Sequence, residues 1–327
     1  MRAVRAERAG GPEVMSVTEV PEPEPATGEL LVDVAAAGVN FIDTYRRSGV
    51  YPMDFPHVPG SEGAGTVRAV GPGVEGVRLG DRVAWAAAPA SYAEQVVVPA
   101  AVAVPVPDGL DLAEAAALPL QGMTAHYLVA STVPLGPEHT VLLTAAAGGV
   151  GLLLAQLATA RGARVIGTVG TPEKEQLARQ AGCSEVIRYT ELPDLTAQLP
   201  QLVREMTDGA GVDVVYDGVG RDTFDASLAS LRPRGTLVLF GGASGQVPPV
   251  DLQRLNTAGS VFVTRPTLGH YTATRSELEW RAREVLGAAA AGELEVRVGA
   301  RYDLADAARA HAALEGRETT GKVLLLP

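Results

Sequence analysis

From Val141 onward, short apolar runs alternate with segments of helical periodicity. The apolar runs read VLLT, RVIGTV, SEVIRY, VDVVYD and GTLVLF, and SVFVT follows later. Strands that alternate with helices of about 10 to 15 residues are typical of parallel strand–helix–strand units. Such units close with right-handed crossovers into a doubly wound sheet, so the pattern predicts an α/β domain with a parallel sheet.

The rest of the chain follows a different pattern. The first 110 residues are rich in valine, and glycine or proline breaks recur at 10–12, 49–52, 59–65, 71–73 and 80, which predicts a strand-dominated domain. A helical stretch at 112–129 follows. After Thr267 mixed elements return, with helices expected at about 276–291 and 305–314 and a last strand KVLLL. The predicted domains are therefore a strand-rich one of 1–125 and 267–327 and an inserted doubly wound one of 126–266.

A run from Val141 to Ala160 contains no charged residue, so it poses a choice between a membrane span and a phosphate-binding turn. About 20 apolar residues can cross a bilayer, but Gly148 and Gly149 would each weaken such a helix at its centre by roughly 1 kcal/mol. A strand, a glycine turn and a helix starting near Gly149 fit better. The free N–H groups and positive dipole end of that helix suit a pyrophosphate.

The turn TAAAGGVG keeps part of the dinucleotide-binding pattern G-x-G-x-x-G. Ala146 stands in the first glycine place, while Gly148 and Gly151 occupy the later ones. Because the turn follows a strand, opens a helix and begins a series of alternating units, it predicts a dinucleotide site. An ordinary tight joint between strand and helix is the alternative.

The end of the second strand favours NADPH over NADH. An NAD site needs a carboxylate about 20 residues after the turn, for the ribose 2′-hydroxyl. This chain has no acid at 167–171; Thr171 and Pro172 instead start a helix, and Lys174 follows within its first turn. Lys174 could meet a 2′-phosphate, and a solvated surface lysine is the alternative.

Charge and cysteine content narrow the function classes. The net charge of −11 and the pI near 5.0 disfavour binding to phosphate backbones, which argues against a nucleic-acid partner. The single cysteine, Cys183, excludes a disulfide framework within the chain and a thiolate-rich zinc site. With no second membrane candidate and no signal-peptide pattern at Met1, we expect a cytoplasmic protein with no membrane partner.

Linked motifs along the whole chain carry a family resemblance. They are GVNFIDTYRRSGVYP (38–52), PGSEGAGTVRAVGPGV (59–74), GDRVAW (80–85), LPLQGMTAHYL (118–128), AAAGGVG (145–151) and YDGVGRDTF (216–224). On these motifs the chain resembles the zinc-independent quinone oxidoreductases, which include zeta-crystallin-like NADPH:quinone reductases, of the medium-chain dehydrogenase/reductase superfamily. The resemblance implies a GroES-like catalytic domain, a Rossmann domain that binds NADPH, and a homodimer.

The resemblance also implies that no metal takes part. In zinc-containing alcohol dehydrogenases of the superfamily, a cysteine and a histidine from the segments that here read GVNFID and GSEGAG ligate the catalytic zinc. This chain has Asn40 and Ser61 at those places and lacks the four-cysteine lobe. Hydride transfer without a Lewis acid suits an acceptor that takes hydride readily, such as a quinone or an activated alkene, better than an alcohol.

Similarity to the family implies a set of NADPH contacts. Most of them follow the carboxyl ends of parallel strands, where doubly wound sheets bind ligands, and Gly242 stands where relatives often carry an asparagine. The implied contacts are Asn40, Phe41, Ile42, Asp43, Thr44, Tyr45, Tyr127, Gly149, Val150, Gly170, Thr171, Lys174, Tyr189, Val219, Gly241, Gly242, Ala243, Ser244, Pro266, Thr267, Leu268 and Arg317.

Tyr45 is the first candidate for a catalytic contact with the acceptor, with Asn40 and Asp43 nearby on the same loop. A tyrosine hydroxyl can donate to a developing oxyanion, and a quinone gains such charge as hydride arrives. A tyrosine that only packs against the cofactor is the alternative.

Three functions stay open at this point. The leading hypothesis is an NADPH-dependent quinone reductase, which moves hydride from nicotinamide C4 to the quinone in a dry, oriented site. The second moves the same hydride to an enone, a 2-alkenal or an enoyl thioester. The third, suggested by the related lens crystallins, is an NADPH-binding structural or RNA-binding protein, although the acidic balance opposes RNA.

Overall fold

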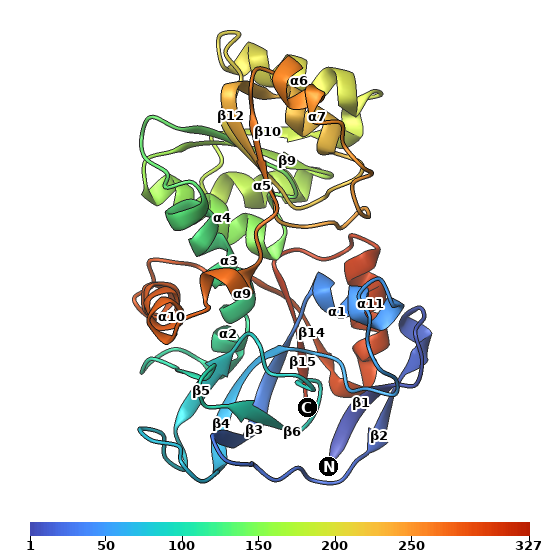
Figure 1. Cartoon of the computed structure of the whole chain (residues 1–327), viewed down its shortest axis with the longest axis vertical. Helices are drawn as coiled ribbons and strands as arrows, with labels where there is room; N and C mark the ends of the chain where they lie inside the picture. Colours follow the sequence, from blue (N-terminus) through green and yellow to red (C-terminus); the bar gives the residue numbers. More distant parts are fainter. The chain divides into compact units, whose positions relative to one another are not determined.

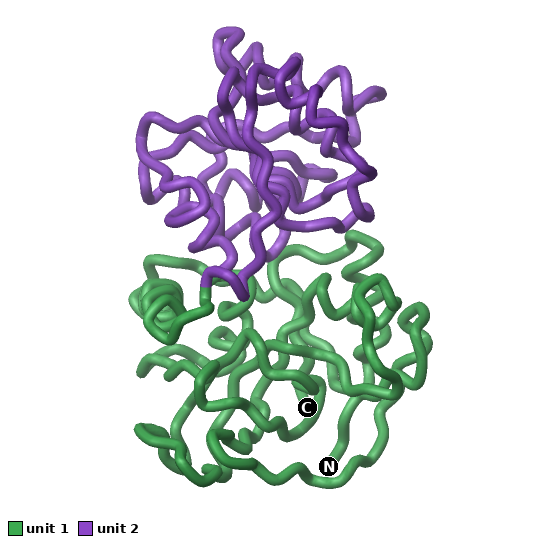
Figure 2. Tube along the Cα trace, viewed as in Figure 1, with its two compact units in different colours: residues 1–123, 272–327 green, residues 124–271 purple.

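The computed structural model describes all residues, 1–327, and divides the chain into two compact units. Unit 1 contains residues 1–123 and 272–327, and unit 2 contains residues 124–271 (Figure 2). Relative to the expected boundaries, the first change of unit comes two residues earlier and the second five residues later.

Unit 2 is a parallel sheet with helices between its strands (Figure 1). Its strand order, β10-β9-β8-β11-β12-β13, starts from the third strand, runs to the first and then continues with the fourth, which is the Rossmann order. The strands are β8 (Thr140–Leu143), β9 (Arg164–Val169), β10 (Glu185–Arg188), β11 (Val212–Asp217), β12 (Leu231–Leu239) and β13 (Phe262–Thr264). All neighbouring pairs are parallel, as the alternating pattern predicts.

Among the helices of unit 2, α5 (Pro172–Gln180) begins and ends where local signals place it. Thr171 caps the helix that begins at Pro172, since its hydroxyl accepts the Lys174 N–H at 3.3 Å, and Gly182 just beyond the helix has φ +107°. The helices are α4 (Gly149–Ala160), α5 (Pro172–Gln180), α6 (Leu195–Met206), α7 (Phe224–Ala229), α8 (Gln253–Thr257) and α9 (Leu268–Tyr271), with a 3₁₀ turn at Tyr189–Glu191.

Unit 1 is built on a mostly antiparallel sheet in the order β14-β15-β3-β4-β5-β7, with β6 also paired to β3 and a separate β1–β2 pair. Valine and other apolar side chains from β3, β4 and β15 fill its core. The strands are β1 (Arg2–Ala6), β2 (Met15–Glu19), β3 (Glu29–Val39), β4 (Glu62–Val70), β5 (Arg82–Trp85), β6 (Gln95–Pro99), β7 (Val104–Pro105), β14 (Val298–Asp303) and β15 (Lys322–Leu326).

Unit 1 has one long helix, α10 (Arg275–Ala290), and several short ones, and one expectation about its helices is wrong. The stretch 112–129 is not one helix: Asp111 caps α2 (Leu112–Ala116), Pro119 starts α3 (Pro119–Tyr127), which runs into unit 2, and a π-helical turn follows at Leu128–Thr132. Proline disfavours helical backbone in the residue before it, which explains the break. The others are α1 (Phe41–Ser48), α10 (Arg275–Ala290) and α11 (Ala307–Glu315), with 3₁₀ turns at Pro12–Val14 and Leu304–Asp306.

No helix in the structure combines the length and the apolar character that crossing a bilayer requires. The uncharged run that raised the question is divided between β8, a turn and α4.

Candidate active site

The turn between β8 and α4 in unit 2 presents backbone rather than side chains. Gly148 is the N-cap of α4 with extended backbone (φ −77°, ψ 172°), and no side chain accepts from the first N–H groups there. A Cβ on Gly151 would lie 2.8 Å from the carbonyl oxygen of Ala146, so only glycine lets the helix pack this closely against the turn. The first N–H groups of α4, at the positive end of the helix, therefore have no side-chain cap, as an anion site requires.

Ala146 explains why the incomplete glycine motif still forms a tight turn. Its N–H donates to Thr168 O at 3.1 Å, and its side chain is buried against β9 beside Gly167. The preceding Ala145 takes the left-handed conformation with φ +51°. The small side chains thus fill the place in which the usual motif has its first glycine.

Asp217, at the end of β11, organises the loop beside this turn and was missed by the sequence reasoning. Its carboxylate is fully buried and accepts hydrogen bonds from Thr144 Oγ1 at 3.2 Å, Val219 N at 2.8 Å and Gly220 N at 3.0 Å. Further donors are the hydroxyls of Thr223 and Ser227, each at 2.7 Å. An acid followed by glycines at the end of the fourth strand is the signal that could have identified it.

The loop after β12 packs directly on the loop after β11. Ser244 N and Ser244 Oγ both donate to Val219 O at 2.9 Å, and a Cβ on Gly241 would lie 2.8 Å from Gly218. The structure thus brings together the predicted contacts Val219 and Gly241–Ser244, which are half-buried. These loops follow neighbouring strands at the carboxyl edge of the sheet, close to the point at which the strand order reverses between β8 and β11.

A second group of predicted contacts meets at the start of α5. Tyr189, in the 3₁₀ turn after β10, places its hydroxyl against Gly170, because a Cβ on Gly170 would lie 2.9 Å from that oxygen. Lys174 and Tyr189 are both half-buried. Glycine, the Thr171 cap, a lysine and a tyrosine hydroxyl are groups that can surround a phosphate.

The remaining predicted contacts lie in varied surroundings. Tyr127 is buried and stacks on Tyr271 at 4.3 Å between ring centroids, with 7° between the ring planes. Pro266–Leu268 follow β13, and Arg317 is exposed in unit 1 just after α11, with φ +59°. Their contacts with a cofactor remain predictions.

The segment with Tyr45 is helix α1, not the expected loop. Its polar and apolar faces are inverted: the charged residues Asp43 and Arg47 are 1% and 2% exposed, whereas Phe41, Ile42 and Tyr45 reach solvent. Asp43 starts the helix, because its carboxylate accepts the Asn40 N–H at 3.0 Å. The buried residues 40, 43 and 47 are polar and share one face of the segment. The usual rule that the apolar face of an amphipathic helix is the buried one therefore gives the wrong orientation for α1.

Asn40 turns its side chain into the protein. Its Nδ2 donates to Glu62 Oε2 at 2.7 Å, and its Oδ1 accepts from Lys322 Nζ at 2.8 Å and from Gln121 Nε2 at 3.3 Å. With 3% exposure, the amide is committed to this network. The sequence placed Asn40 beside the acceptor, and the structure gives its side chain to Glu62 and Lys322 instead.

Asp43 belongs to a second buried network, which links α1 to α11, the helix beside it (Figure 1). The Tyr92 hydroxyl donates to Asp43 Oδ2 at 3.0 Å and lies 3.1 Å from His311 Nε2. Arg47 Nη1 lies 3.0 Å from His311 Nδ1 and also binds Glu315. Because a guanidinium only donates, Nδ1 accepts and the proton of neutral His311 resides on Nε2, pointing to Tyr92.

Burial sets the protonation of this network. Desolvation raises the pKa of Asp43 to about 6, against smaller lowering effects of the Asn40 N–H and Tyr92. Desolvation also lowers the pKa of His311 to about 3, helped by the charge of Arg47, and raises the pKa of Tyr92 well above its usual range. His311 is therefore neutral in the folded protein near pH 7, whereas Asp43 is mostly ionised.

Tyr45 lies in an aromatic group on the outer face of α1. Its ring meets Tyr51 edge-on at 5.6 Å and Phe41 at 6.2 Å between centroids. Tyr51 is 37% exposed, and the neighbouring Val50 and Met53 are 50% and 39% exposed. The sequence reasoning singled out Tyr45 and missed Tyr51, although both lie in one aromatic-rich segment. This face offers flat apolar surface and phenolic hydroxyls to a ligand.

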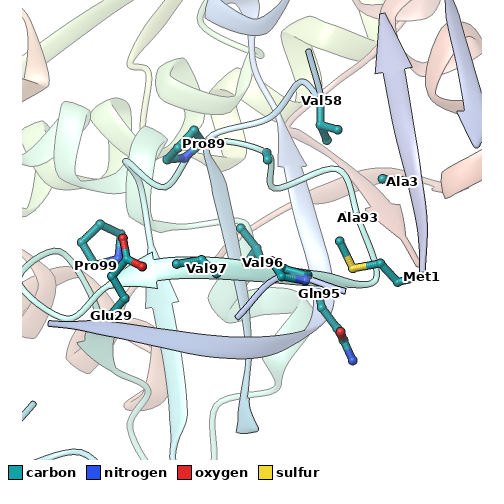
Figure 3. Close-up of a pocket in the computed structure, with 12 residues that line it drawn as sticks. Met1, Ala3, Glu29, Val58, Pro89, Ala93, Gln95, Val96, Val97 and Pro99 are labelled. Atoms are coloured by element: carbon teal, nitrogen blue, oxygen red, sulfur yellow. The ribbon is translucent and has the colours of Figure 1, made fainter. Parts of the chain in front are cut away.

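A hollow of about 350 Å³ elsewhere in unit 1 is not this site (Figure 3). It is lined mainly by alanine, valine and proline side chains, and Glu29 and Gln95 are its only polar residues. None of the predicted site residues lines it.

Asn40 and Ser61 stand at the two positions where zinc-containing alcohol dehydrogenases carry zinc ligands, and their surroundings are unlike a zinc site. The chain contains no cluster of three or more His, Cys, Asp or Glu side chains that could hold a metal ion. Asn40 Oδ1 already accepts from the Lys322 ammonium, and Ser61 is 5% exposed. Thiolate and imidazole, the usual zinc ligands, are missing from both positions.

Comparisons with known proteins agree with this geometry. Residues 26–108 match the family described as alcohol dehydrogenase GroES-like domain, and residues 149–282 match the one described as zinc-binding dehydrogenase. A quinone oxidoreductase of Pseudomonas aeruginosa is 47% identical over 320 residues, which is 97% of both proteins. A 2-haloacrylate reductase of Burkholderia is 41% identical over 98% of this chain and 97% of its own.

A solved structure extends the likeness to three dimensions. The Escherichia coli quinone oxidoreductase complexed with NADPH superimposes with a TM-score of 0.96 and 43% identity, and the match covers 100% of both chains.

Proposed function

Because the chain belongs to the quinone oxidoreductases of the medium-chain dehydrogenase/reductase superfamily, we propose that it is an NADPH-dependent quinone reductase. The observation that carries the proposal is the glycine turn of unit 2, where no side chain caps the N-terminus of α4 after Gly148 and where Gly151 lets the helix lie close to the turn. Bound NADPH would supply a hydride from C4 of its nicotinamide.

The residues of unit 2 fit NADPH at two points. The α4 N-terminus suits the diphosphate, and Lys174 with Tyr189 suits the 2′-phosphate, because a lysine can bind a phosphate as a point charge. No carboxylate occupies the end of β9, where NADH would need one. The loops at Val219 and Gly241–Ser244 lie at the same edge of the sheet and complete the proposed cofactor site.

Unit 1 contributes the acceptor surface in this proposal. The Tyr45 hydroxyl donates a hydrogen bond to the acceptor oxygen as that oxygen gains negative charge. Phe41 and Tyr51 lie beside Tyr45 and offer apolar ring surface for a planar quinone. Asn40 and Asp43 support the helix from inside and do not contact the acceptor.

An anaerobic assay tests this function. NADPH oxidation with a naphthoquinone should be fast, and Tyr45→Phe should lower kcat by about 10²-fold if the hydroxyl stabilises the oxyanion. Tyr302→Phe, on β14 rather than on α1, is the matched control and should leave kcat unchanged. A Tyr45→Phe enzyme with the kcat of the parent would remove Tyr45 from the chemistry, and a parent without quinone turnover would refute the function.

Reduction of an activated alkene is the second candidate, favoured by the likeness to the 2-haloacrylate reductase. Hydride would then reach the β-carbon of the alkene, and the carbonyl oxygen would again gain the negative charge. A 2-alkenal and a haloacrylate in the same assay distinguish the two functions: the proposal expects kcat/KM to be larger for the naphthoquinone.

We also propose a homodimer formed through the edge strand β13. This strand ends the sheet of unit 2, and Phe262 and Val263 on it are 63% and 39% exposed. An exposed apolar edge strand is a surface for pairing with a second copy. Phe262→Glu should shift the mass in light scattering from dimer to monomer, whereas Leu79→Glu, at a 68% exposed position in unit 1, should not. A monomeric parent would contradict the dimer.

We further propose that the protein is located in the cytoplasm. The one thiol, Cys183, is buried, and desolvation raises its pKa to about 12, so it is an unreactive side chain. A chain with no disulfide to form is suited to a reducing compartment.

A further inference from the structure

Lys322 and Glu62 form an ion pair sealed from solvent in unit 1, and no step of the proposed reaction uses it. Their side chains are 1% and 0% exposed, and Lys322 Nζ contacts Glu62 Oε2 directly. Replacing a buried ion pair by apolar side chains is often neutral or stabilising, so stability alone is a weak reason for such a pair. The pair therefore calls for another role.

The backbone of β3 is shaped to let this pair close. Glu62 opens β4 and Lys322 opens β15, and these two strands flank β3. Between them lies Gly38: a Cβ there would be 2.8 Å from both Glu62 Cδ and Lys322 Cε. Only glycine at this position leaves room for the ion pair above the strand, two residues before Asn40.

The pair holds Asn40 in one orientation. Nδ2 must face the carboxylate of Glu62 and Oδ1 must face the ammonium of Lys322, so a flipped amide would oppose like groups on both sides. Gln121 Nε2 donates to the same Oδ1 at 3.3 Å, and Leu120 N donates to Glu62 Oε1 at 2.7 Å. Residues from β3, β4, β15 and α3 thus meet at one amide.

Asn40 in turn fixes the beginning of α1. Its backbone N–H donates to Asp43, and Phe41 is the first residue of the helix. Tyr45 follows Phe41 by one helical turn on the outward face, so a displaced Asn40 would move both rings.

We propose that Lys322 is a positioning residue: its ammonium, paired with Glu62, fixes the Asn40 amide and thereby the first turn of α1, which holds Tyr45 for the acceptor. The proposal rests on the quinone reductase function, but its test includes a measurement on the free protein. Lys322 does not touch the acceptor and acts only through Asn40.

The test uses the double variant Lys322→Met/Glu62→Gln. It removes both charges together, so no buried charge is left unpaired, and the new amide oxygen at position 62 can still accept from Leu120 N. We expect kcat with a naphthoquinone to fall about 10- to 100-fold through misplacement of Tyr45, while the Kd for NADPH stays unchanged. In this background Tyr45→Phe should cause little further loss, because the hydroxyl is already out of place.

Hydrogen exchange of the free protein separates positioning from a general loss of stability. Amides of residues 41–45 should exchange about fivefold faster in the double variant, the change expected for one lost hydrogen bond. Amides of β11 in unit 2 serve as the internal control and should be unaffected. Asn40→Ala, which keeps the ion pair and removes only the link, should reproduce both the exchange and the kcat changes, including when the double variant does not fold.

Two results would overturn the proposal. One is unchanged exchange at 41–45 in the folded variants. The other is a Tyr45→Phe effect of full size in the Lys322→Met/Glu62→Gln or Asn40→Ala background. A parent protein that does not reduce quinones would instead refute the proposed function, and the exchange measurement would still decide whether Lys322 positions α1.

Discussion

The two regions proposed to bind ligands are made from different parts of the chain. The turn of unit 2 is made of backbone: glycines at 148 and 151 and a helix N-terminus, all within a few residues. The α1 region of unit 1 is made of side chains from distant segments, with Asn40, Glu62 and Lys322 meeting in one buried network. A site made from adjacent backbone depends on local geometry, whereas a site made from distant side chains depends on the completed fold.

The largest effect should come from the glycines of the turn. Gly151→Ala places a Cβ against backbone atoms of Ala145 and Ala146, which cannot move aside, and should lower the free energy of unfolding by about 3 kcal/mol. Gly148→Ala is the contrast, because its Cβ would meet only Ala145 O at 3.2 Å. It should fold normally and weaken NADPH binding. Urea unfolding and NADPH titration measure the two effects, and equal stability losses would show that the turn does not depend on close packing at Gly151.

Lys174 should have an intermediate effect. Lys174→Glu removes a cation from the proposed 2′-phosphate site and should weaken NADPH binding by about 2 kcal/mol relative to NADH. Glu173→Gln is the matched control, because Glu173 is exposed on the same helical turn. Fluorescence titration with both cofactors gives the preference. An unchanged preference for NADPH in Lys174→Glu would refute this assignment.

The smallest effect should be a pH dependence of stability in the α1 network. The pKa of Asp43 is raised to about 6 by burial, so the folded state binds more protons than the unfolded state between about pH 4 and 6, and Asp43 lowers stability as pH rises. The pKa of His311 is lowered to about 3, also chiefly by burial, so His311 raises stability as pH rises from about 3 to 6.5. Over their shared range the two contributions oppose each other.

Replacing either Asp43 or His311 should reveal the pH-dependent contribution of the other residue to stability. The groups that face Asp43 are Tyr92, Arg46 and Lys322, and those that face His311 are Arg47 and Tyr92. As the pH rises from 4 to 6, the free energy of unfolding of His311→Gln should fall relative to that of the parent, by at most about 1.4 kcal/mol per pH unit. Over the same rise in pH, the free energy of unfolding of Asp43→Asn should increase relative to the parent by a similar amount. Urea unfolding at pH 4, 5 and 6 measures both slopes. Parallel slopes in the two variants would contradict the assigned pKa shifts.

The same contrast explains how far the sequence could predict the molecule. The strands of unit 2, the Thr171 cap and the turn at Gly148 were predictable because each depends on a few neighbouring residues. The role of Asp217 could also have been predicted, because Val219 and Gly220, whose N–H groups it accepts, follow it closely in the chain. The break at Pro119 was visible in the sequence and was overlooked.

The orientation of α1 and the partners of its buried residues could not be predicted from neighbouring residues in the sequence. Its buried face is polar and its exposed face aromatic, which reverses the pattern that identifies a surface helix. The partners of Asn40 lie 22 and 282 residues away in the chain, so no spacing in the sequence points to them. The motif was enough to single out Tyr45 as a candidate, whereas Tyr51 and the ion pair required the fold.

In the proposed function, hydride passes from NADPH to a quinone. Single turnover under anaerobic conditions is the most direct test, with the protein loaded with NADPH in which both hydrogens at C4 are replaced by deuterium, and then mixed with a naphthoquinone. We expect the nicotinamide absorbance to be lost at a rate slowed by deuterium, with one hydroquinone formed per NADPH. No loss of absorbance, or a loss without deuterium leaving C4, would contradict it.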